Sequence, residues 1–234
     1  MSAKKVALFG LGSMGIGMAR SLLRAGHTVR GYDIRAEVTE NFARESGNNQ
    51  PFADIAAEID VAIIVVLNAS QAADILFGDQ GIVRQMRPGA TVMNCVTVSP
   101  EDARLAAARC ENSDIDYLDA PISGGAIKAG EGALSIMASG SAQAFDKSRE
   151  CLDAMAETVF ELGDAAGQGS LMKSVNQLLA GVHIATMAEA LAFGMKQGLE
   201  AKTFLQVIQK CAGTSWMLEN RAPHIIDGDY SPRS

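Results

Sequence analysis

Short apolar runs alternate with amphipathic stretches over the first two thirds of the chain. Apolar runs bounded by turn residues predict strands, and a run that is apolar at every position is typical of a parallel strand covered on both faces. Residues 61–67 form such a run. The expected strands are residues 5–10, 28–33, 61–67, 90–96, 116–120, 134–138 and 158–162.

Helical patterns fill the segments between these strands. They cover residues 13–25, 36–45, 70–77, 100–110 and 142–155. Ser99 is a natural N-cap for the fourth of these helices, and Pro100 suits its first turn. Strands that alternate with helices predict an α/β fold, a Rossmann-type doubly wound parallel sheet.

The pattern changes after the glycine-rich segment 163–169, where strand signals end. Residues 170–197 predict one long helix of roughly 40 Å, and residues 202–211 and 215–226 predict two shorter ones. We therefore expect a dinucleotide-binding domain over residues 1–164 and an all-helical substrate or dimerisation domain over 165–234, joined by a long interdomain helix. That helix is apolar nearly all round from Leu171 to Phe193, so we expect it to be buried.

Composition and charge narrow the class of protein. The chain is 48% hydrophobic and 20% charged, with a formal net charge of −7, which is an ordinary globular composition. The negative charge argues against nucleic acid and anionic membranes as partners. We find no apolar run long enough to span a bilayer and no secretory signal pattern, so we expect a cytoplasmic protein.

Cysteines and histidines do not suggest a metal site. The four cysteines are widely spaced without a CxxC pair, and the three histidines form no HxxxH pattern. Reduced, mostly buried thiols are the simplest interpretation. The cysteines are Cys95, Cys110, Cys151 and Cys211.

A glycine loop, Gly10-Leu11-Gly12-Ser13-Met14-Gly15, joins the first predicted strand to the first helix. In a dinucleotide-binding site, Gly10 permits the tight turn, Gly12 lets the backbone approach a pyrophosphate, and Gly15 lets helix and strand pack closely. The free N–H groups at the helix start then face the phosphates. The alternative, an ordinary tight turn, remains open at this point.

An acidic residue supports the cofactor interpretation. Asp33 ends the second predicted strand, 18 residues after Gly15. A carboxylate there accepts hydrogen bonds from the ribose hydroxyls and repels a 2′-phosphate, which favours NAD over NADP. Arg35, two residues on, could instead pair with a phosphate, and Asp33 could be a simple turn residue.

Lys173 is one of two formally charged residues in the most apolar part of the long helix. It shares a helix face with Asn176 and Gln177, at spacings of three and four residues. A lysine made more acidic by desolvation can deliver a proton to a carbonyl oxygen that is being reduced. The alternative is a lysine near the helix start that reaches solvent.

A second glycine loop follows the strand that ends at Ala120. The backbone N–H groups of Ser123, Gly124 and Gly125 could form a concave site for a small carboxylate. The alternative is an ordinary strand-to-helix turn.

In this order, the motifs resemble the β-hydroxyacid dehydrogenase family, over essentially the whole chain. The matching segments are residues 10–15, 119–125 and 167–177. Residues 176–183 and 215–221 resemble most the branch of the family that acts on four-carbon sugar acids such as L-threonate.

The resemblance implies an oxidoreductase that transfers hydride between a small hydroxy acid and NAD. Lys173 would be the catalytic acid/base. The implied substrate-binding residues are Ser123, Gly124, Gly125 and Asn176. The implied cofactor-binding residues beyond the first loop and Asp33 are Leu67, Asn68 and Thr97, with Thr97 near the nicotinamide ribose.

Family members normally continue beyond the position of Ser234, with further helices and a second lysine that contacts the cofactor. We therefore expect either a fragment of a longer protein, cut short at its C-terminal end, or a naturally short chain. Because the sequence ends just after the polar segment 229–233, we expect apolar surface to be exposed where the further helices would pack. A catalytically incompetent cofactor-binding fragment and a non-catalytic Rossmann module remain alternatives to the dehydrogenase. The long apolar helix suggests a homo-oligomer, either a dimer or a tetramer.

Overall fold

The computed structural model describes residues 3–230. The chain divides between Lys173 and Ser174 into two compact units. The first unit contains every described strand, and the second is helical. The segment 231–234, which includes the end of the polar segment 229–233, lies outside the described residues.

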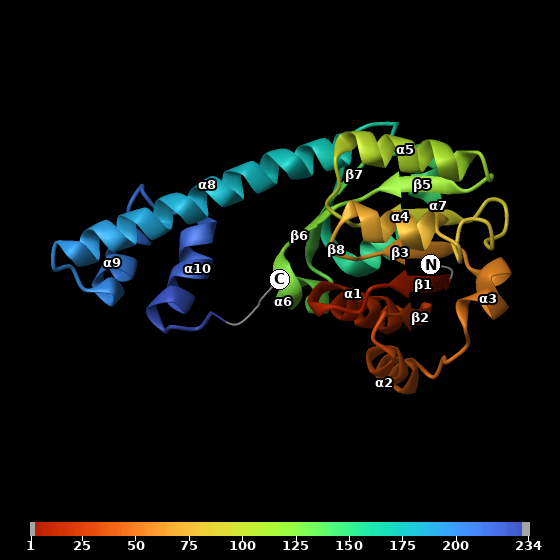
Figure 1. The fold of residues 1–234 in the computed structure, drawn as a ribbon, viewed down its shortest axis with the longest axis horizontal. Helices are drawn as coiled ribbons and strands as arrows, with labels where there is room; N and C mark the ends of the chain where they lie inside the picture. Colours follow the sequence, from red (N-terminus) through yellow and green to blue (C-terminus); the bar gives the residue numbers. More distant parts are fainter. Residues whose placement is uncertain (1–2, 231–234) are drawn as a thin grey trace. The chain divides into compact units, whose positions relative to one another are not determined.

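The first unit is built on a five-stranded parallel sheet with the order β2-β1-β3-β4-β5 (Figure 1). Its strands are β1 (Lys5–Phe9), β2 (Thr28–Tyr32), β3 (Val61–Ile64), β4 (Thr91–Asn94) and β5 (Asp116–Asp119). The chain passes from β1 to β2 on one side and then to β3 on the other. Ligands of doubly wound folds bind in the crevice beside such a switch point, at the carboxyl ends of the strands.

Helices cover both faces of this sheet. They are α1 (Ser13–Arg24), α2 (Ala36–Ser46), α3 (Phe52–Ile55), the 3₁₀ turn η1 (Ala56–Glu58), α4 (Ala69–Phe77) and α5 (Pro100–Glu111). The predicted start of α5 is confirmed: Ser99 Oγ accepts the N–H of Asp102 at 3.1 Å, and Pro100 occupies the first turn. Asn68 caps α4 in the same way.

The last two predicted strands do not extend this sheet. A separate three-stranded sheet has the order β6-β7-β8, with β6 (Ile122–Ser123), β7 (Leu134–Ala138) and β8 (Ala156–Glu161). The β6–β7 pair is antiparallel. The chain leaves the first sheet at Pro121, which has no N–H to donate and whose carbonyl accepts the N–H of Met137. The first five predicted strands therefore form the parallel sheet, and the expectation that the last two continue it was wrong.

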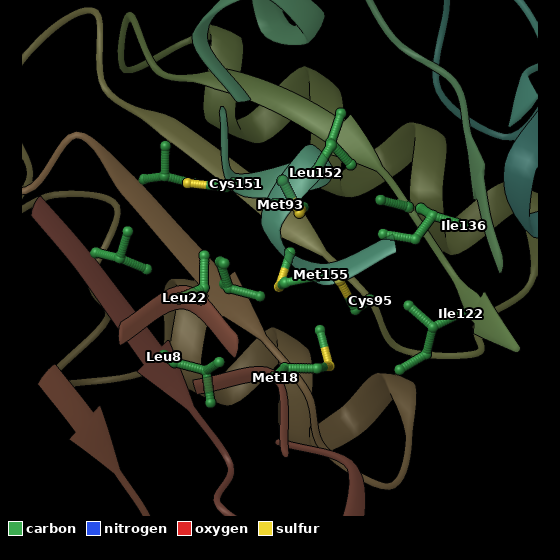
Figure 2. Close-up of a cluster of buried hydrophobic side chains, with 14 of the residues drawn as sticks. Leu8, Met18, Leu22, Met93, Cys95, Ile122, Ile136, Cys151, Leu152 and Met155 are labelled. Carbon is green, nitrogen blue, oxygen red and sulfur yellow. The ribbon is translucent and has the colours of Figure 1, made fainter. Parts of the chain in front are cut away.

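The two sheets of the first unit share a hydrophobic core. Alternate residues of β1 point to opposite faces: Val6 and Leu8 pack with α1 and α7 (Ala142–Met155), whereas Ala7 and Phe9 pack with α4 and α5. Figure 2 shows the first cluster, in which Leu8 lies with side chains from α1, β4, β6, β7 and α7. Both faces are covered, which confirms the doubly wound fold class.

The second unit contains most of α8 (Gln168–Lys196), together with α9 (Ala201–Ile208) and α10 (Trp216–Ile226). The predicted all-helical character is confirmed for its described residues, 174–230. Its own core consists of Met187, Leu191, Phe204, Leu218 and Ala222. The expected domains, one for dinucleotide binding over residues 1–164 and one for substrate binding or dimerisation over residues 165–234, stay predictions.

The expected burial of α8 was wrong. Leu178 and Phe193 are each 68% exposed. The apolar side chains surround the helix, whereas α9 and α10 cover only one stripe of it. Within residues 3–230, α8 is also the one helix long and apolar enough, by length and composition alone, to cross a membrane. The expectation that no apolar run reaches that length was therefore wrong, since a few polar residues are tolerated within such a run.

Candidate active site

In the first glycine loop, packing leaves no room for a side chain at two of the glycines, whereas the third faces open space. A Cβ on Gly10 would lie 2.0 Å from the carbonyl oxygen of Val65, and a Cβ on Gly15 would lie 1.8 Å from that of Gly10. Gly10 also has a φ of +98°, which favours glycine. A Cβ on Gly12 would meet nothing within 4 Å. The loop therefore keeps an open approach at Gly12, as a cradle for a pyrophosphate requires.

Asp33 lies directly beside this loop. Its Oδ2 accepts the N–H of Leu11 at 2.9 Å. Arg35 donates its Nε to Oδ1 at 2.9 Å and its backbone N–H to Oδ1 at 3.0 Å. The hydrogen bond from the Arg35 side chain is the main reason that the pKa of Asp33 is lowered. The carboxylate is thus ionised and faces the loop. Its remaining hydrogen bonds come from Arg35.

The other predicted cofactor residues end neighbouring strands at the same edge of the sheet. Leu67 and Asn68 follow β3, and Thr97 follows β4; all three are exposed. Ser13 and Met14 begin α1 at this edge. Because carboxyl ends of parallel strands share one edge, the structure brings all ten predicted cofactor residues to it.

The helix that follows the second glycine loop packs against the helix that follows the first glycine loop. Ser123 ends β6, and Gly124 precedes α6 (Gly125–Glu131). On α1, Ser21 Oγ donates to the carbonyl of Ala129 in α6 at 2.9 Å. A Cβ on Gly17 would lie 2.7 Å from the backbone nitrogen of Gly130. The predicted substrate loop and the predicted cofactor helix are therefore held together by close backbone packing.

Lys173 is buried, with 7% of its surface exposed. Burial lowers the pKa of its ammonium from the ordinary 10.5, and no neighbouring charge contributes to the change. A lysine of this kind holds its proton less tightly than a surface lysine. The burial disfavours the alternative of a side chain that simply reaches solvent.

Asn176 lies three residues further along α8, in the second unit. It is half-buried, and its Nδ2 donates to Oε1 of Gln177 at 3.3 Å. The helix places it on the same face as Lys173. Its approach to Ser123, Gly124 and Gly125 remains a prediction.

A residue that sequence reasoning left without a role is Asp119. It ends β5 at the same edge of the sheet and is fully buried. Its carboxylate binds the first turn of α8, where Gly167 and Ser170 donate backbone N–H groups to Oδ2 at 3.0 and 2.8 Å. The available signal was an acidic residue that ends an otherwise buried strand.

Three further features of the described residues are a hollow, the lack of a metal-binding cluster and the state of the cysteines. A hollow of about 300 Å³ lies where α4 and α5 end, and it is lined by Phe77, Arg84 and Arg109 among others. Within residues 3–230, no group of three His, Cys, Asp or Glu side chains is placed to hold a metal ion. Cys95, Cys110 and Cys151 are buried and Cys211 is exposed, all as free thiols.

Comparison with known proteins identifies both parts of the chain. Residues 5–163 match the family described as the NAD binding domain of 6-phosphogluconate dehydrogenase. Residues 167–234 match the family described as the NAD-binding domain of NADP-dependent 3-hydroxyisobutyrate dehydrogenase. The two matches meet within the glycine-rich segment 163–169.

Three relatives cover nearly the whole chain. The L-threonate dehydrogenase of Cupriavidus necator is 44% identical over 99% of this chain and 78% of its own length. The NAD-dependent L-serine dehydrogenase of Pseudomonas aeruginosa is 36% identical over 97% of this chain and 79% of its own length. The crystal structure of a 3-hydroxyisobutyrate dehydrogenase from Salmonella typhimurium is 42% identical, with a TM-score of 0.92, over 99% of this chain and 81% of that one.

The glycine cradle, the carboxylate beside it and the sheet order agree with the nucleotide-binding match over residues 5–163. Identities above 40% over almost the full chain place it well within the group. This chain belongs to the 3-hydroxyisobutyrate dehydrogenase-like family of NAD(P)-dependent β-hydroxyacid oxidoreductases.

Proposed function

We propose that this chain oxidises a small hydroxy acid, L-threonate or a related four-carbon sugar acid, with NAD as the cofactor and Lys173 as the general base. The observation that carries the chemistry is the buried Lys173, whose pKa is lowered without help from a neighbouring charge. Support for the substrate class comes from the 44% identity to an enzyme named L-threonate dehydrogenase.

The residues divide the work of the reaction. NAD bound at this edge of the sheet would supply the acceptor for the hydride that leaves the carbinol carbon of the substrate. Neutral Lys173 takes the hydroxyl proton as the carbonyl forms, and in the reverse direction its ammonium returns that proton to the carbonyl oxygen. Backbone N–H groups of Ser123, Gly124 and Gly125 hold the substrate carboxylate, and Asn176 orients the substrate beside the lysine.

The preference for NAD rests on Asp33. The ionised carboxylate suits ribose hydroxyls and repels a 2′-phosphate. Arg35 has to release part of its bonding to Asp33 when the ribose binds. Leu67, Asn68 and Thr97 line the remainder of the cofactor site, with Thr97 near the nicotinamide ribose.

The assembly and location follow from the same proposal. The exposed apolar side chains of α8 favour a homo-oligomer, a dimer or a tetramer, that covers them. We keep the cytoplasmic location, and the absence of membrane or nucleic-acid partners, as predictions.

A screen of small hydroxy acids tests the proposal. The protein is incubated with L-threonate, L-serine, 3-hydroxyisobutyrate and tartronate in turn, and reduction of NAD or NADP is followed at 340 nm. We expect turnover with L-threonate to be greatest, with kcat/KM for NAD at least about tenfold above that for NADP, which corresponds to about 1.4 kcal/mol.

Lys173→Met is the control, and it should bind NAD normally without turnover. If the wild-type protein binds NAD and oxidises none of these acids, the alternative of a catalytically incompetent protein is correct. Equal kcat/KM for the two cofactors would contradict the role given to Asp33.

A further inference from the structure

The start of α8 is bound by a buried carboxylate that comes from a distant part of the chain. Asp119 is fully buried at the end of β5, about 50 residues before the helix. Its Oδ2 accepts the N–H of Gly167 at 3.0 Å and that of Ser170 at 2.8 Å, and its Oδ1 accepts the hydroxyl of Ser170 at 2.7 Å. The first N–H groups of a helix have no partner within it, so this carboxylate caps α8 from outside its own sequence.

Ser139, at the end of β7, completes the attachment. Its Oγ accepts the N–H of Gly169 at 3.0 Å and donates to Asp119 Oδ2 at 3.3 Å. A Cβ on Gly169 would lie 2.3 Å from the carbonyl oxygen of Met137, so the helix backbone is in close contact with β7. Two strand ends from two sheets therefore fix the first turn of α8.

Lys173 lies three residues after Ser170, on the next turn of the same helix. A helix is stiff over one turn, so the placement of its first turn determines where the Lys173 side chain lies. Asp119 does not contribute a charge effect to the pKa of Lys173, whose lowering comes from burial alone. Any influence of Asp119 on the lysine is therefore exerted through the position of the helix.

We propose that Asp119 is a positioning residue, which clamps the first turn of α8 and so holds Lys173 in its buried place at the edge of the sheet. The inference rests on the proposed role of Lys173 as the general base. Loss of the clamp lets water reach the lysine, and a solvated lysine binds its proton more tightly and deprotonates the substrate less readily.

The test compares variants of Asp119 with a matched variant on the same strand. Asp119→Ala removes the clamp, and Ser170→Ala removes the hydroxyl bond to Oδ1 while it keeps the backbone bond. Asp116→Ala is the control, because Asp116 begins β5 and pairs with Lys147 away from α8. The Asp116→Ala variant should lose the ion pair with Lys147 and some stability, but it should leave the hydrogen bonds of Asp119 to α8 in place.

Two readouts are needed, one of which does not involve turnover. Competitive acylation followed by peptide mass spectrometry gives the pKa of Lys173 in each folded protein. Steady-state kinetics give kcat, and the Kd of NAD reports the integrity of the nucleotide site. All are measured below the unfolding temperature of each variant.

We expect Asp119→Ala to raise the pKa of Lys173 towards its ordinary value and to lower kcat near neutral pH by at least about tenfold. Ser170→Ala should move both quantities in the same direction by less, and it decides the question if Asp119→Ala does not fold. The Kd of NAD should change by less than about twofold, and Asp116→Ala should leave the pKa of Lys173 unchanged.

A wild-type pKa and kcat in both clamp variants would overturn the inference. An equal pKa change in Asp116→Ala would do the same, since it would show a general loss of stability. Failure of the proposed function gives a different result: Lys173→Met would then retain turnover, whatever the clamp variants do.

Discussion

At the residue scale, the three glycines of the first loop have different physical tasks. Gly10 and Gly15 face backbone atoms that leave no room for a Cβ. Gly12 has an extended backbone conformation that any residue can adopt, and a Cβ there meets open space. Its missing side chain serves no packing role in the protein itself, which is what we expect of a position reserved for a ligand.

Gly12→Ala therefore separates binding from folding. We expect its unfolding temperature to stay close to that of the wild type, because the added methyl group meets no protein atom. We expect the Kd of NAD to rise at least about tenfold, because the methyl group occupies the approach of the pyrophosphate. Calorimetric titration with NAD and thermal unfolding measure the two quantities.

The matched change is Gly15→Ala, which should lower the unfolding temperature because its Cβ would overlap the Gly10 carbonyl. The role of Gly12 would be refuted by an alanine variant that binds NAD as tightly as the wild type.

Single residues differ in how far the sequence could predict them. Asp33 was predicted to bind the ribose of the same cofactor that the glycine loop would bind. The structure places it beside that loop, because the spacing between loop and strand end is a local property of a β-α-β unit. Asp119 was present in a quoted motif but was given no role. Its partners at the start of α8 lie 48 to 51 residues later in the chain, and no local pattern reports such a contact.

At the element scale, the pattern of apolar positions predicted the strand and helix types well. β7 begins and ends where it was predicted, and α8 does so to within two residues. β6 was missed because two residues are too few for a periodic signal. The burial of α8 could not be predicted, since a helix that is apolar on all sides shows no preferred face and its covering elements are not encoded in its own pattern.

The contact between α1 and α6 gives a prediction at this scale. Gly17→Val would force the two helices apart, because a Cβ at Gly17 already lies 2.7 Å from the nitrogen of Gly130. The Ser123-Gly124-Gly125 loop would move with α6. We expect the KM of the hydroxy acid to rise about tenfold, with a smaller change in the Kd of NAD.

Ile16→Val serves as the control for a general loss of packing on α1, since Ile16 packs against the first hydrophobic cluster. A rise in KM that is equal in both variants would show that the α1–α6 contact has no specific role at the substrate loop.

At the scale of the whole molecule, the first unit gathers chemistry from separate parts of the sequence at one edge of its sheet. The glycine loop, Asp33 and Asp119 all lie at the carboxyl ends of parallel strands. This arrangement could be predicted from alternating elements, because parallel strands share their direction. The division into two sheets could not, because it depends on where the chain leaves the ladder at Pro121.

The central claim is that Lys173 acts as the general base, and the pH dependence of kcat tests it most directly. A base works in its neutral form, so oxidation of the hydroxy acid should speed up as pH rises and level off above the pKa of the lysine. Since burial lowers that pKa, the midpoint should lie below the ordinary 10.5. In the reverse reaction the ammonium is required, and the rate should fall over the same range.

The decisive measurement is therefore the pH profile of kcat for oxidation in the wild-type protein and in Lys173→Met. Our account predicts a rising limb with a midpoint below 10.5 in the wild type, and in the variant a loss of about 10²-fold or more together with that limb. A variant that keeps both the rate and the rising limb would contradict it.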